Sequence, residues 1–417
     1  MVGDGESEVV RLRCPKCGWE SPSKTTFQCP TCAVVLEAIV EISRLSRSQR
    51  LDIRMRTDRT IWRWFEFFPV EDRSAIVSLG EGYTPLLQSF SLSAQIGIPR
   101  LYLKNDTVLP TGSLKDRSNA VGLSKAKELG YKTVAVVSTG NAAASVAAYA
   151  AAAGLRSVVL VPEGTSLSKV AQAAAYGATV VVVEGDFEEA GRLYKAALQV
   201  FGWYDCLSTN PSRNEGKKSY AYELLDQLKG QAPDWIIHPT AGGTGIYAMW
   251  KGYNELLTLG WVDRLPKLAA AQSERAAPIV AAVKKGLSDV EPVVARETVA
   301  ESIQVGYPKS MGWRALEAIR ASHGTAAALS DDEILAAQSS LARCAGIFAE
   351  PAGAISVAAA KELRREGIIA EGDLVVCNIT GHGLKQPSAI RIPERELRPI
   401  APDLAALQER LEARLRS

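Results

Sequence analysis

Residues 133–153 read TVAVVSTGNAAASVAAYAAAA, and this stretch indicates the fold class. Thr133–Val137 is a run of apolar, mostly β-branched residues, which is typical of a strand buried on both faces. Ala142–Ala153 is rich in alanine, the residue with the highest helix propensity. The loop between them contains Ser, Thr, Gly and Asn, so the stretch predicts a buried strand, a tight turn and a helix.

The same order of elements recurs along the chain. We expect further strands at Ser157–Val161, Thr179–Val183, Trp235–His238 and Leu374–Asn378, and further helices at Ser118–Leu129, Leu167–Tyr176, Glu188–Val200 and Tyr247–Leu257. This alternation predicts an α/β architecture with buried parallel strands, in which ligands bind at the carboxyl ends of the strands.

Composition and charge exclude several classes of protein. The 417 residues include 48 Lys plus Arg and 46 Asp plus Glu, a formal net charge of +2. This balance provides no electrostatic surface for nucleic acid or for an anionic membrane, and we expect neither as a partner. The three histidines, His238, His323 and His382, are too far apart in sequence for an H-E-x-x-H protease or a His-rich metal centre.

Targeting signals and disulfides are not expected. The first ten residues are acidic and lack the apolar stretch of a leader, and no segment is long and apolar enough to span a membrane. The seven cysteines are odd in number and four lie in two close pairs, which favours a reducing compartment. We therefore expect a cytoplasmic protein.

The two cysteine pairs predict a structural metal site. Cys14 and Cys17 form one C-x2-C knuckle and Cys29 and Cys32 form a second. Four thiolates with no open position suit structural Zn rather than catalytic Zn. Four independent free cysteines are the alternative. A ribbon that binds nucleic acid is another, since Arg44–Arg59 is rich in arginine, but its aspartates favour a solvated helix face.

The segment Pro110-Thr-Gly-Ser-Leu-Lys115-Asp-Arg117 is the first of three loops that could carry chemistry. A Pro/Gly turn opens a helix here, and Ser113 is a natural cap for it. The positive end of the helix dipole disfavours an ammonium and would lower the pKa of Lys115, which helps a lysine that must form an imine. The alternative is an exposed lysine with its head in water.

The second loop, Ser138-Thr139-Gly-Asn141, follows a strand and begins the Ala-rich helix. Its hydroxyls, its amide and the free N–H groups of the helix could bind a carboxylate or another anion. A tight turn chosen only for packing is equally consistent with this sequence.

The third loop contains Gly242, Gly243, Thr244 and Gly245 after a strand and before a helix. Successive glycines let backbone N–H groups converge on phosphate oxygens. The loop lacks the Lys-Ser/Thr ending of a nucleoside triphosphatase. Its Gly243-x-Gly245-x-x-Ala248 pattern loosely matches a dinucleotide fingerprint, with Glu274 as the acidic residue, so a dehydrogenase stays an alternative.

Together the three loops describe a site for pyridoxal phosphate, a cofactor that acts as an electron sink while the protein orients it. Residues 14 to about 390 resemble the pyridoxal-phosphate-dependent threonine synthases and, more broadly, the tryptophan synthase β-like fold type II. The motifs that carry the resemblance, in the family's order, are Gly80-Glu-Gly-Tyr-Thr84-Pro85, Gly112-Ser-Leu-Lys115-Asp-Arg117, Ser138-Thr-Gly-Asn141, Asn210-Pro-Ser-Arg213-Asn-Glu-Gly-Lys-Lys218, Gly242-Gly-Thr-Gly245 and Thr380-Gly-His-Gly383-Leu-Lys385.

The resemblance implies a role for each motif. Lys115 would hold the cofactor as a Schiff base, Asn141 would bond its 3′-oxygen, and Thr380 would meet its pyridine nitrogen, while Gly242–Gly245 would bind its phosphate. Ser138 and Thr139 would contact the substrate, and Arg213 would bind the substrate's phosphate. The implied reaction converts O-phospho-L-homoserine and water to L-threonine and phosphate, with no catalytic histidine, in a homodimer.

Five positions depart from the family's pattern, and three of these departures lie where the substrate would be: the positions are Leu114, Ser118, Ala142, Tyr307 and His382. They leave open a related replacement reaction, such as cysteate synthesis from phosphoserine and sulfite, or deamination of threonine or serine. A nucleic-acid-binding protein on an inactive enzyme scaffold is a further alternative.

The implied organisation is a two-domain fold with an appended ribbon. We expect a zinc-ribbon-like segment at 1–42, a large cofactor-binding domain at 43–130 and 220–390, and a small substrate domain at 131–219. A C-terminal arm at 391–417, with an amphipathic helix at Leu404–Leu415, would pack on the protein or contact another subunit.

Overall fold

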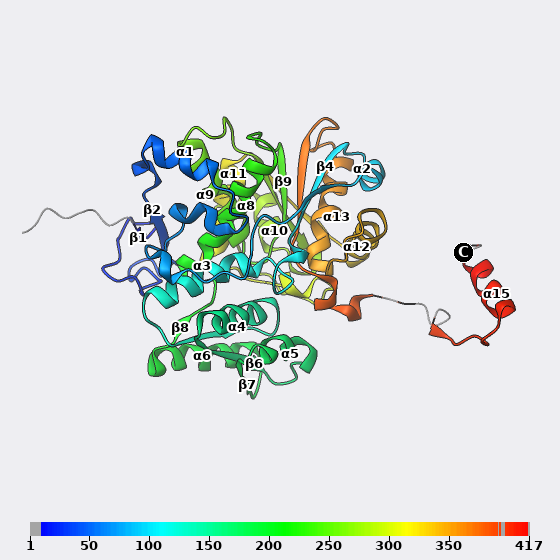
Figure 1. Cartoon of the computed structure of the whole chain (residues 1–417), viewed down its shortest axis with the longest axis horizontal. Coiled ribbons are helices and arrows are strands. Elements are labelled where there is room, and N and C mark those ends of the chain that lie inside the picture. Colours follow the sequence, from blue (N-terminus) through cyan, green and yellow to red (C-terminus); the bar gives the residue numbers. More distant parts are fainter. Residues whose placement is uncertain (1–9, 391, 393–396, 416–417) are drawn as a thin grey trace, which may run out of the picture. The chain divides into compact units, whose positions relative to one another are not determined.

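The computed structural model describes residues 10–390, 392 and 397–415 (Figure 1). The acidic residues at positions 1–9 and Pro393 of the predicted arm lie outside this part of the chain. One compact unit ends at Lys385 and a second begins at Gln386. The predicted boundaries at residues 42, 130, 219 and 390 remain predictions.

Two separate sheets form the framework of the first unit. The larger has the order β11-β10-β9-β12-β4-β3. Adjacent strands in it are parallel, except that β3 runs antiparallel to β4. Its strands are β3 (Leu86–Gln88), β4 (Arg100–Asn105), β9 (Trp235–Pro239), β10 (Lys267–Ser273), β11 (Thr325–Leu329) and β12 (Leu374–Ile379). Because β9 and β12 are the central strands, their carboxyl ends are the natural place for a ligand.

The smaller sheet is parallel throughout, with the order β7-β6-β5-β8. Its strands are β5 (Thr133–Val137), β6 (Arg156–Pro162), β7 (Thr179–Val183) and β8 (Tyr204–Asp205). The five strands expected from the sequence are confirmed, but the prediction that β7 is buried is wrong. β7 is one of the two edge strands of this sheet, and Val182 on it is 64% exposed because nothing in the described structure pairs beyond it.

Helices cover both sheets, and the predicted ones are confirmed to within three residues at each end. They are α2 (Phe90–Ile96), α3 (Lys115–Glu128), α4 (Asn141–Ala153), α5 (Leu167–Ala175), α6 (Phe187–Phe201), α7 (Pro211–Glu215), α8 (Ser219–Gln227), α9 (Thr244–Thr258), α10 (Pro278–Lys285), α11 (Ser310–Ala321), α12 (Asp331–Ala345) and α13 (Pro351–Arg365). The alanines of α4 let it pack closely against α3, so the helices that start at Lys115 and Asn141 lie side by side.

The cysteine-rich segment forms a small two-stranded antiparallel sheet, β1 (Val10–Arg13) with β2 (Glu37–Val40). Polar contacts attach it to α9 and α11. The Nζ of Lys251 lies 3.0 Å from a carboxylate oxygen of Glu37, and the hydroxyl of Tyr247 donates to Glu37 at 2.9 Å. Arg314, a buried residue of α11, donates to the carbonyl oxygen of Val35. The ribbon is therefore part of the first unit's packing.

The Arg-rich segment after the ribbon forms α1 (Arg47–Met55), of which only Ile53 is buried, so a solvated helix face is confirmed. In the second unit, α15 (Leu404–Leu415) confirms the predicted C-terminal helix. No helix in the described part of the chain is long and apolar enough to cross a bilayer.

Candidate active site

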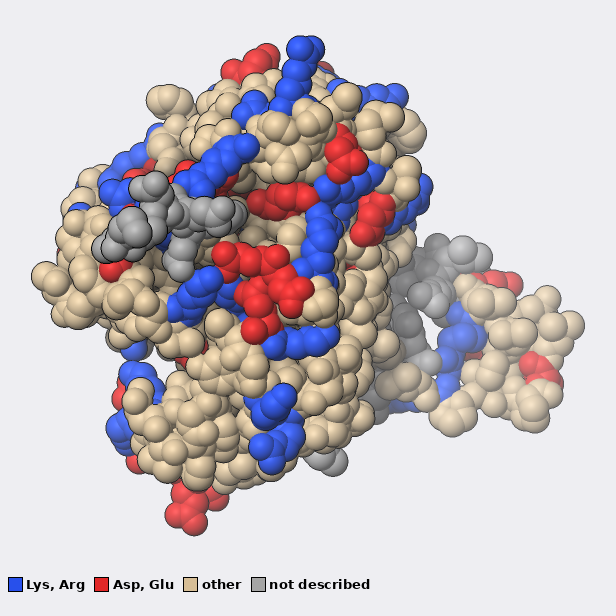
Figure 2. All heavy atoms as spheres, turned by 60° about the vertical axis from the view of Figure 1, so that its left-hand side comes forward, with Lys and Arg blue, Asp and Glu red and all other residues tan. Residues whose placement is uncertain are grey.

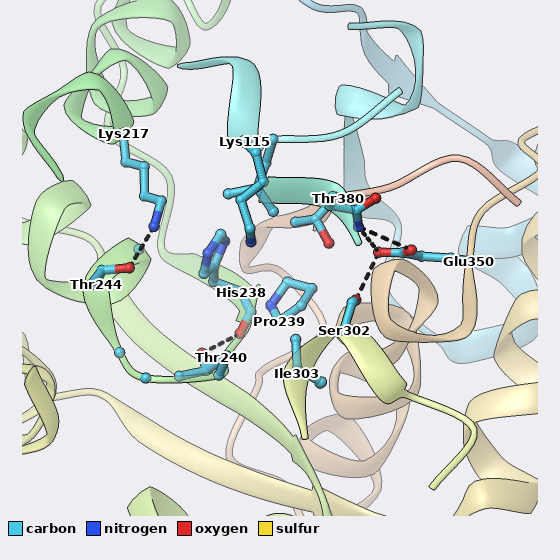
Figure 3. A pocket seen from close by; sticks show the side chains of 16 residues that line it. Lys115, Lys217, His238, Pro239, Thr240, Thr244, Ser302, Ile303, Glu350 and Thr380 are labelled. Carbon is cyan, nitrogen blue, oxygen red and sulfur yellow. Dashed lines mark hydrogen bonds between the residues drawn. The ribbon is translucent and has the colours of Figure 1, made fainter. Parts of the chain in front are cut away.

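A cavity lies where the carboxyl ends of β9 and β12 meet the first turns of α3, α4 and α9 (Figure 3). It has an empty volume of about 420 Å³, counting space open to solvent. The residues that line it are Leu114, Lys115, Asn141, Lys217, His238, Pro239, Thr240, Ala241, Gly242, Gly243, Thr244, Gly245, Ser302, Ile303, Glu350 and Thr380. All seven residues that the sequence assigned to the cofactor are among them.

Lys115 is the first residue of α3, and its Nζ has no hydrogen-bond partner among the described residues. Burial, and to a smaller extent the nearby positive charge of Arg213, lower the pKa of Lys115 to about 8. The direction agrees with the expectation, although the structure gives burial rather than the helix dipole as the main cause. The alternative of an exposed lysine is wrong.

The turn that carries Lys115 is held by Asp116 and by the end of β12. The backbone N–H and the hydroxyl of Thr111 donate to Asp116 at 2.7 and 2.6 Å, and Ser145 of α4 donates to it at 2.6 Å. The N–H of Leu114 donates to the carbonyl oxygen of Thr380 at 2.9 Å. These bonds bring three motifs that are far apart in sequence to one place.

The predicted cap of this helix needs a correction. Leu114, not Ser113, is the N-cap residue of α3, and no side chain caps it. The hydroxyl of Ser113 only accepts a long bond of 3.4 Å from the N–H of Lys115, because the turn towards Thr380 draws Ser113 back from the helix.

The glycine loop forms a cradle at the start of α9. Gly243 has a φ of +92°, and a Cβ at this position would lie 2.5 Å from the Cβ of Ala315. A Cβ at Gly245 would lie 2.1 Å from Nε2 of His238. Only glycine therefore fits at these two positions, and the exposed N–H groups of the helix start can face an anion.

Two residues at this end of the cavity were missed by the sequence reasoning. Lys217 donates from Nζ to the hydroxyl of Thr244 (Figure 3). His238 is buried, and burial together with nearby cations lowers its pKa to about 3, so its ring is neutral at physiological pH. The amide of Asn378 lies 3.0 Å from Nδ1 of His238 and donates to it, which leaves the ring proton on Nε2.

The opposite end of the cavity contains a third unexpected residue, Glu350, at the N-cap of α13. The side-chain amide of Asn141 donates to its two carboxylate oxygens at 3.1 and 3.2 Å, and the hydroxyl of Ser302 donates at 2.9 Å. Burial raises the pKa of Glu350. Its signal in the sequence was the Glu350-Pro351 pair, which is typical of a helix start but carries no chemistry by itself.

The residues assigned to the substrate lie outside this lining. Ser138 and Thr139 are partly buried in the turn that precedes Asn141. Arg213, on α7, is 4% exposed, and its Nε donates to Asn119 at 2.8 Å. Arg213 has no carboxylate partner among the described residues, and its charge acts on both Lys115 and Lys217. The structure brings it close to the cavity without making it part of the wall.

Of the five departures from the family's pattern, Leu114 lines the cavity, and the other four lie outside its described wall. Ser118 is fully buried in α3, and Ala142 is the second residue of α4. Tyr307 is 49% exposed, and the ring of His382 packs edge-on against Phe348 at 5.6 Å. Glu274, the acidic residue of the dehydrogenase alternative, is exposed beyond the end of β10 and does not line the cavity either.

The four cysteines come together in the ribbon. Their Sγ atoms all lie within 4.8 Å of one another, and those of Cys17 and Cys29 are 3.7 Å apart. Ligands at about 2.3 Å from one tetrahedral ion stand about 3.8 Å apart, so the donor set fits a thiolate-bound metal. The alternative of four independent cysteines is not supported.

The fold and the cavity define the class of protein. Residues 77–381 match the family described as "Pyridoxal-phosphate dependent enzyme". The cavity fits that cofactor, since it combines an unpaired lysine of lowered pKa with a glycine cradle at a helix start. Among solved structures, maize serine racemase has a TM-score of 0.64 at 21% identity, over 80% of this chain and 93% of that chain, and shows the same fold.

Similar proteins of known activity place the chain more narrowly. It is 42% identical to the threonine synthase of Methanocaldococcus jannaschii over 93% of this chain and 96% of that protein. It is 41% identical to the threonine synthase of Methanosarcina acetivorans, over 92% and 94%, and 40% identical to that of Mycobacterium tuberculosis, over 82% and 93%. The chain belongs to the threonine synthase family.

Proposed function

We propose that the protein is a threonine synthase, which converts O-phospho-L-homoserine and water to L-threonine and phosphate. The observation that carries this proposal is the full-length similarity to threonine synthases, 42% identity over 96% of the first of them. The lysine, the asparagine, the glycine loop and Thr380 that the family's pattern requires all line one cavity in this chain, which supports the proposal.

Lys115 is the residue that we propose to bind the cofactor and to move protons at the substrate's carbon atoms. With a pKa of about 8, about one tenth of the Lys115 amines are neutral at pH 7, against about one in 3,000 at an ordinary lysine pKa. A neutral amine is what attachment to an aldehyde and proton abstraction both need. When bound, the cofactor supplies an electron sink for the substrate's carbanion.

The other residues would orient the two reactants. The amides at Gly242–Gly245 would bind the cofactor's phosphate, Asn141 its 3′-oxygen and Thr380 its ring nitrogen. Thr380 offers an uncharged hydroxyl rather than a carboxylate to that nitrogen, which favours elimination and replacement over transamination. Arg213, a buried cation without a carboxylate partner among the described residues, would bind the substrate's phosphate, and Ser138 and Thr139 would contact its amino-acid end.

We further propose a structural Zn in the ribbon, held by Cys14, Cys17, Cys29 and Cys32, and a homodimer in the cytoplasm. The partner in the reaction is a phosphorylated amino acid of low molecular weight. Nucleic acid is not expected as a partner: Figure 2 shows blue and red side chains interspersed on this face, with no broad region of positive charge. Such mixing gives no electrostatic attraction for a polyanion.

A substrate comparison tests the function. The purified protein with pyridoxal phosphate is given O-phospho-L-homoserine, O-phospho-L-serine with sulfite, or L-threonine, and phosphate release and the mass of the product are measured. Release of phosphate with formation of threonine from the first substrate is the expected result. The proposal would be contradicted if phosphohomoserine did not react and the protein instead formed cysteate from phosphoserine and sulfite, or a keto acid from L-threonine.

A further inference from the structure

Lys217 is a buried lysine without a counter-charge. It lies in the short 3-10 helix Gly216–Lys218 between α7 and α8, and it is 5% exposed. Its Nζ makes one hydrogen bond, to the hydroxyl of Thr244, and it has no ion pair with any described residue. Burial and the charges of Lys115 and Arg213 lower the pKa of Lys217 well below its ordinary value.

The other three buried lysines of the described chain are different. Lys104 pairs with Glu223 at 2.6 Å, and Lys125 pairs with Glu128. Lys218, the next residue after Lys217, pairs with Glu255 at 2.7 Å and with Glu215 at 2.8 Å. An unpaired buried cation is costly unless an anion meets it. The chain thus satisfies each of these lysines internally and leaves Lys217 to a group that is not part of the protein.

The position of Lys217 indicates which anion that is. Its one partner, Thr244, is the first residue of α9 and belongs to the glycine cradle. The N–H groups at this helix start carry a partial positive charge of about half a unit, less than the charge of a phosphate dianion. Since the hydroxyl of Thr244 accepts from Lys217, its own proton is free to be donated into the cradle.

We propose that Lys217 is a cofactor-binding residue that holds the phosphate group of pyridoxal phosphate as its counter-cation, together with Thr244 and the amides of the glycine cradle. The family's motif around Arg213 does not supply this contact, because its lysine is Lys218, which is occupied by two carboxylates. The proposal rests on the cofactor and not on the identity of the substrate.

A comparison of two forms of the cofactor tests the proposal. Apoprotein is titrated with pyridoxal phosphate and, separately, with pyridoxal, which lacks the phosphate, and the visible absorption gives each Kd. Lys217→Gln is expected to raise the Kd for pyridoxal phosphate about 10- to 100-fold, the size of a charge-assisted hydrogen bond. The Kd for pyridoxal should change less than about twofold, and Lys217→Arg should recover part of the loss.

Two further measurements separate this role from a structural one. Lys195→Gln removes an exposed lysine of α6 and should change neither Kd. The unfolding temperature of Lys217→Gln apoprotein should equal or exceed that of the wild type, because the cost of burying an amine without a counter-charge is gone. An unchanged Kd for pyridoxal phosphate, an equal loss for both ligands, or a less stable apoprotein would overturn the proposal. Failure of the wild type to release phosphate from phosphohomoserine would contradict the proposed function and leave this one intact.

Discussion

The glycine cradle offers a sharp test, because two neighbouring glycines differ in the space around them. Gly243→Ala would place a Cβ 2.5 Å from the Cβ of Ala315, at a φ of +92°. The left-handed conformation costs a residue with a Cβ about 1–2 kcal/mol, and overpacking costs about 1–3 kcal/mol. Alanine leaves the unfolded chain fewer conformations than glycine does, which offsets about 0.5 kcal/mol of this loss. We therefore expect a loss of about 2–4 kcal/mol in the free energy of unfolding.

Gly242→Ala is the matched control in the same loop. Its nearest atom would be the Cβ of Pro308 at 3.9 Å, an ordinary contact, so the stability should change by less than about 1 kcal/mol. Thermal unfolding of the two apoproteins measures the difference: for a chain of this length, 2–4 kcal/mol corresponds to a shift of about 2–5 °C. Equal shifts, or a larger shift for Gly242→Ala, would refute the reasoning from close contact.

Three further predictions concern the lysine, the arginine and the metal. Lys115→Ala should abolish the visible absorption of the bound cofactor. The folded pKa of Lys115 is about 8, so between about pH 8 and pH 10.5 only the unfolded chain keeps this proton. The free energy of unfolding of wild-type apoprotein should therefore rise with pH in this range relative to that of Lys115→Ala. Parallel changes of stability with pH in the two proteins would argue against the lowered pKa. Arg213→Ala should raise the KM for the phosphorylated substrate and keep the absorption of the cofactor; an equal loss of both would mean that Arg213 is structural. A strong chelator should lower the unfolding temperature without lowering the kcat of protein that stays folded, and a kcat that falls at once would point to a catalytic metal.

The pattern of apolar residues in the sequence predicts the fold well where strands and helices are both buried. The runs at residues 133–137, 235–238 and 374–378 are strands because parallel strands in the middle of a sheet are apolar on both faces. The same rule fails for β7, since Thr179–Val183 has the composition of a central strand but lies at an edge. Composition records β propensity, whereas the position of a strand in the sheet depends on contacts distant in sequence.

The site is predictable to the extent that its residues belong to loops with their own local signals. Lys115, Asn141 and the glycine loop each begin a helix after a strand or turn, so each could be located separately. Lys217, His238 and Glu350 could not, because a short helix, a strand end and a helix cap acquire a chemical role only when the tertiary fold brings them to one cavity.

The attachment of the ribbon to α9 has a consequence for shortening or recombining the chain. Glu37 is a charged partner of Lys251, and the carbonyl oxygen of Val35 accepts from the buried guanidinium of Arg314. A chain that began at residue 43 would uncover both cations and the face of α9 around Tyr247. Tyr247 and Lys251 lie on α9 within seven residues of Thr244, where the glycine cradle meets the helix. The rest of the first unit therefore does not separate cleanly from the ribbon, and chains recombined at this boundary need compensating substitutions on α9 and α11.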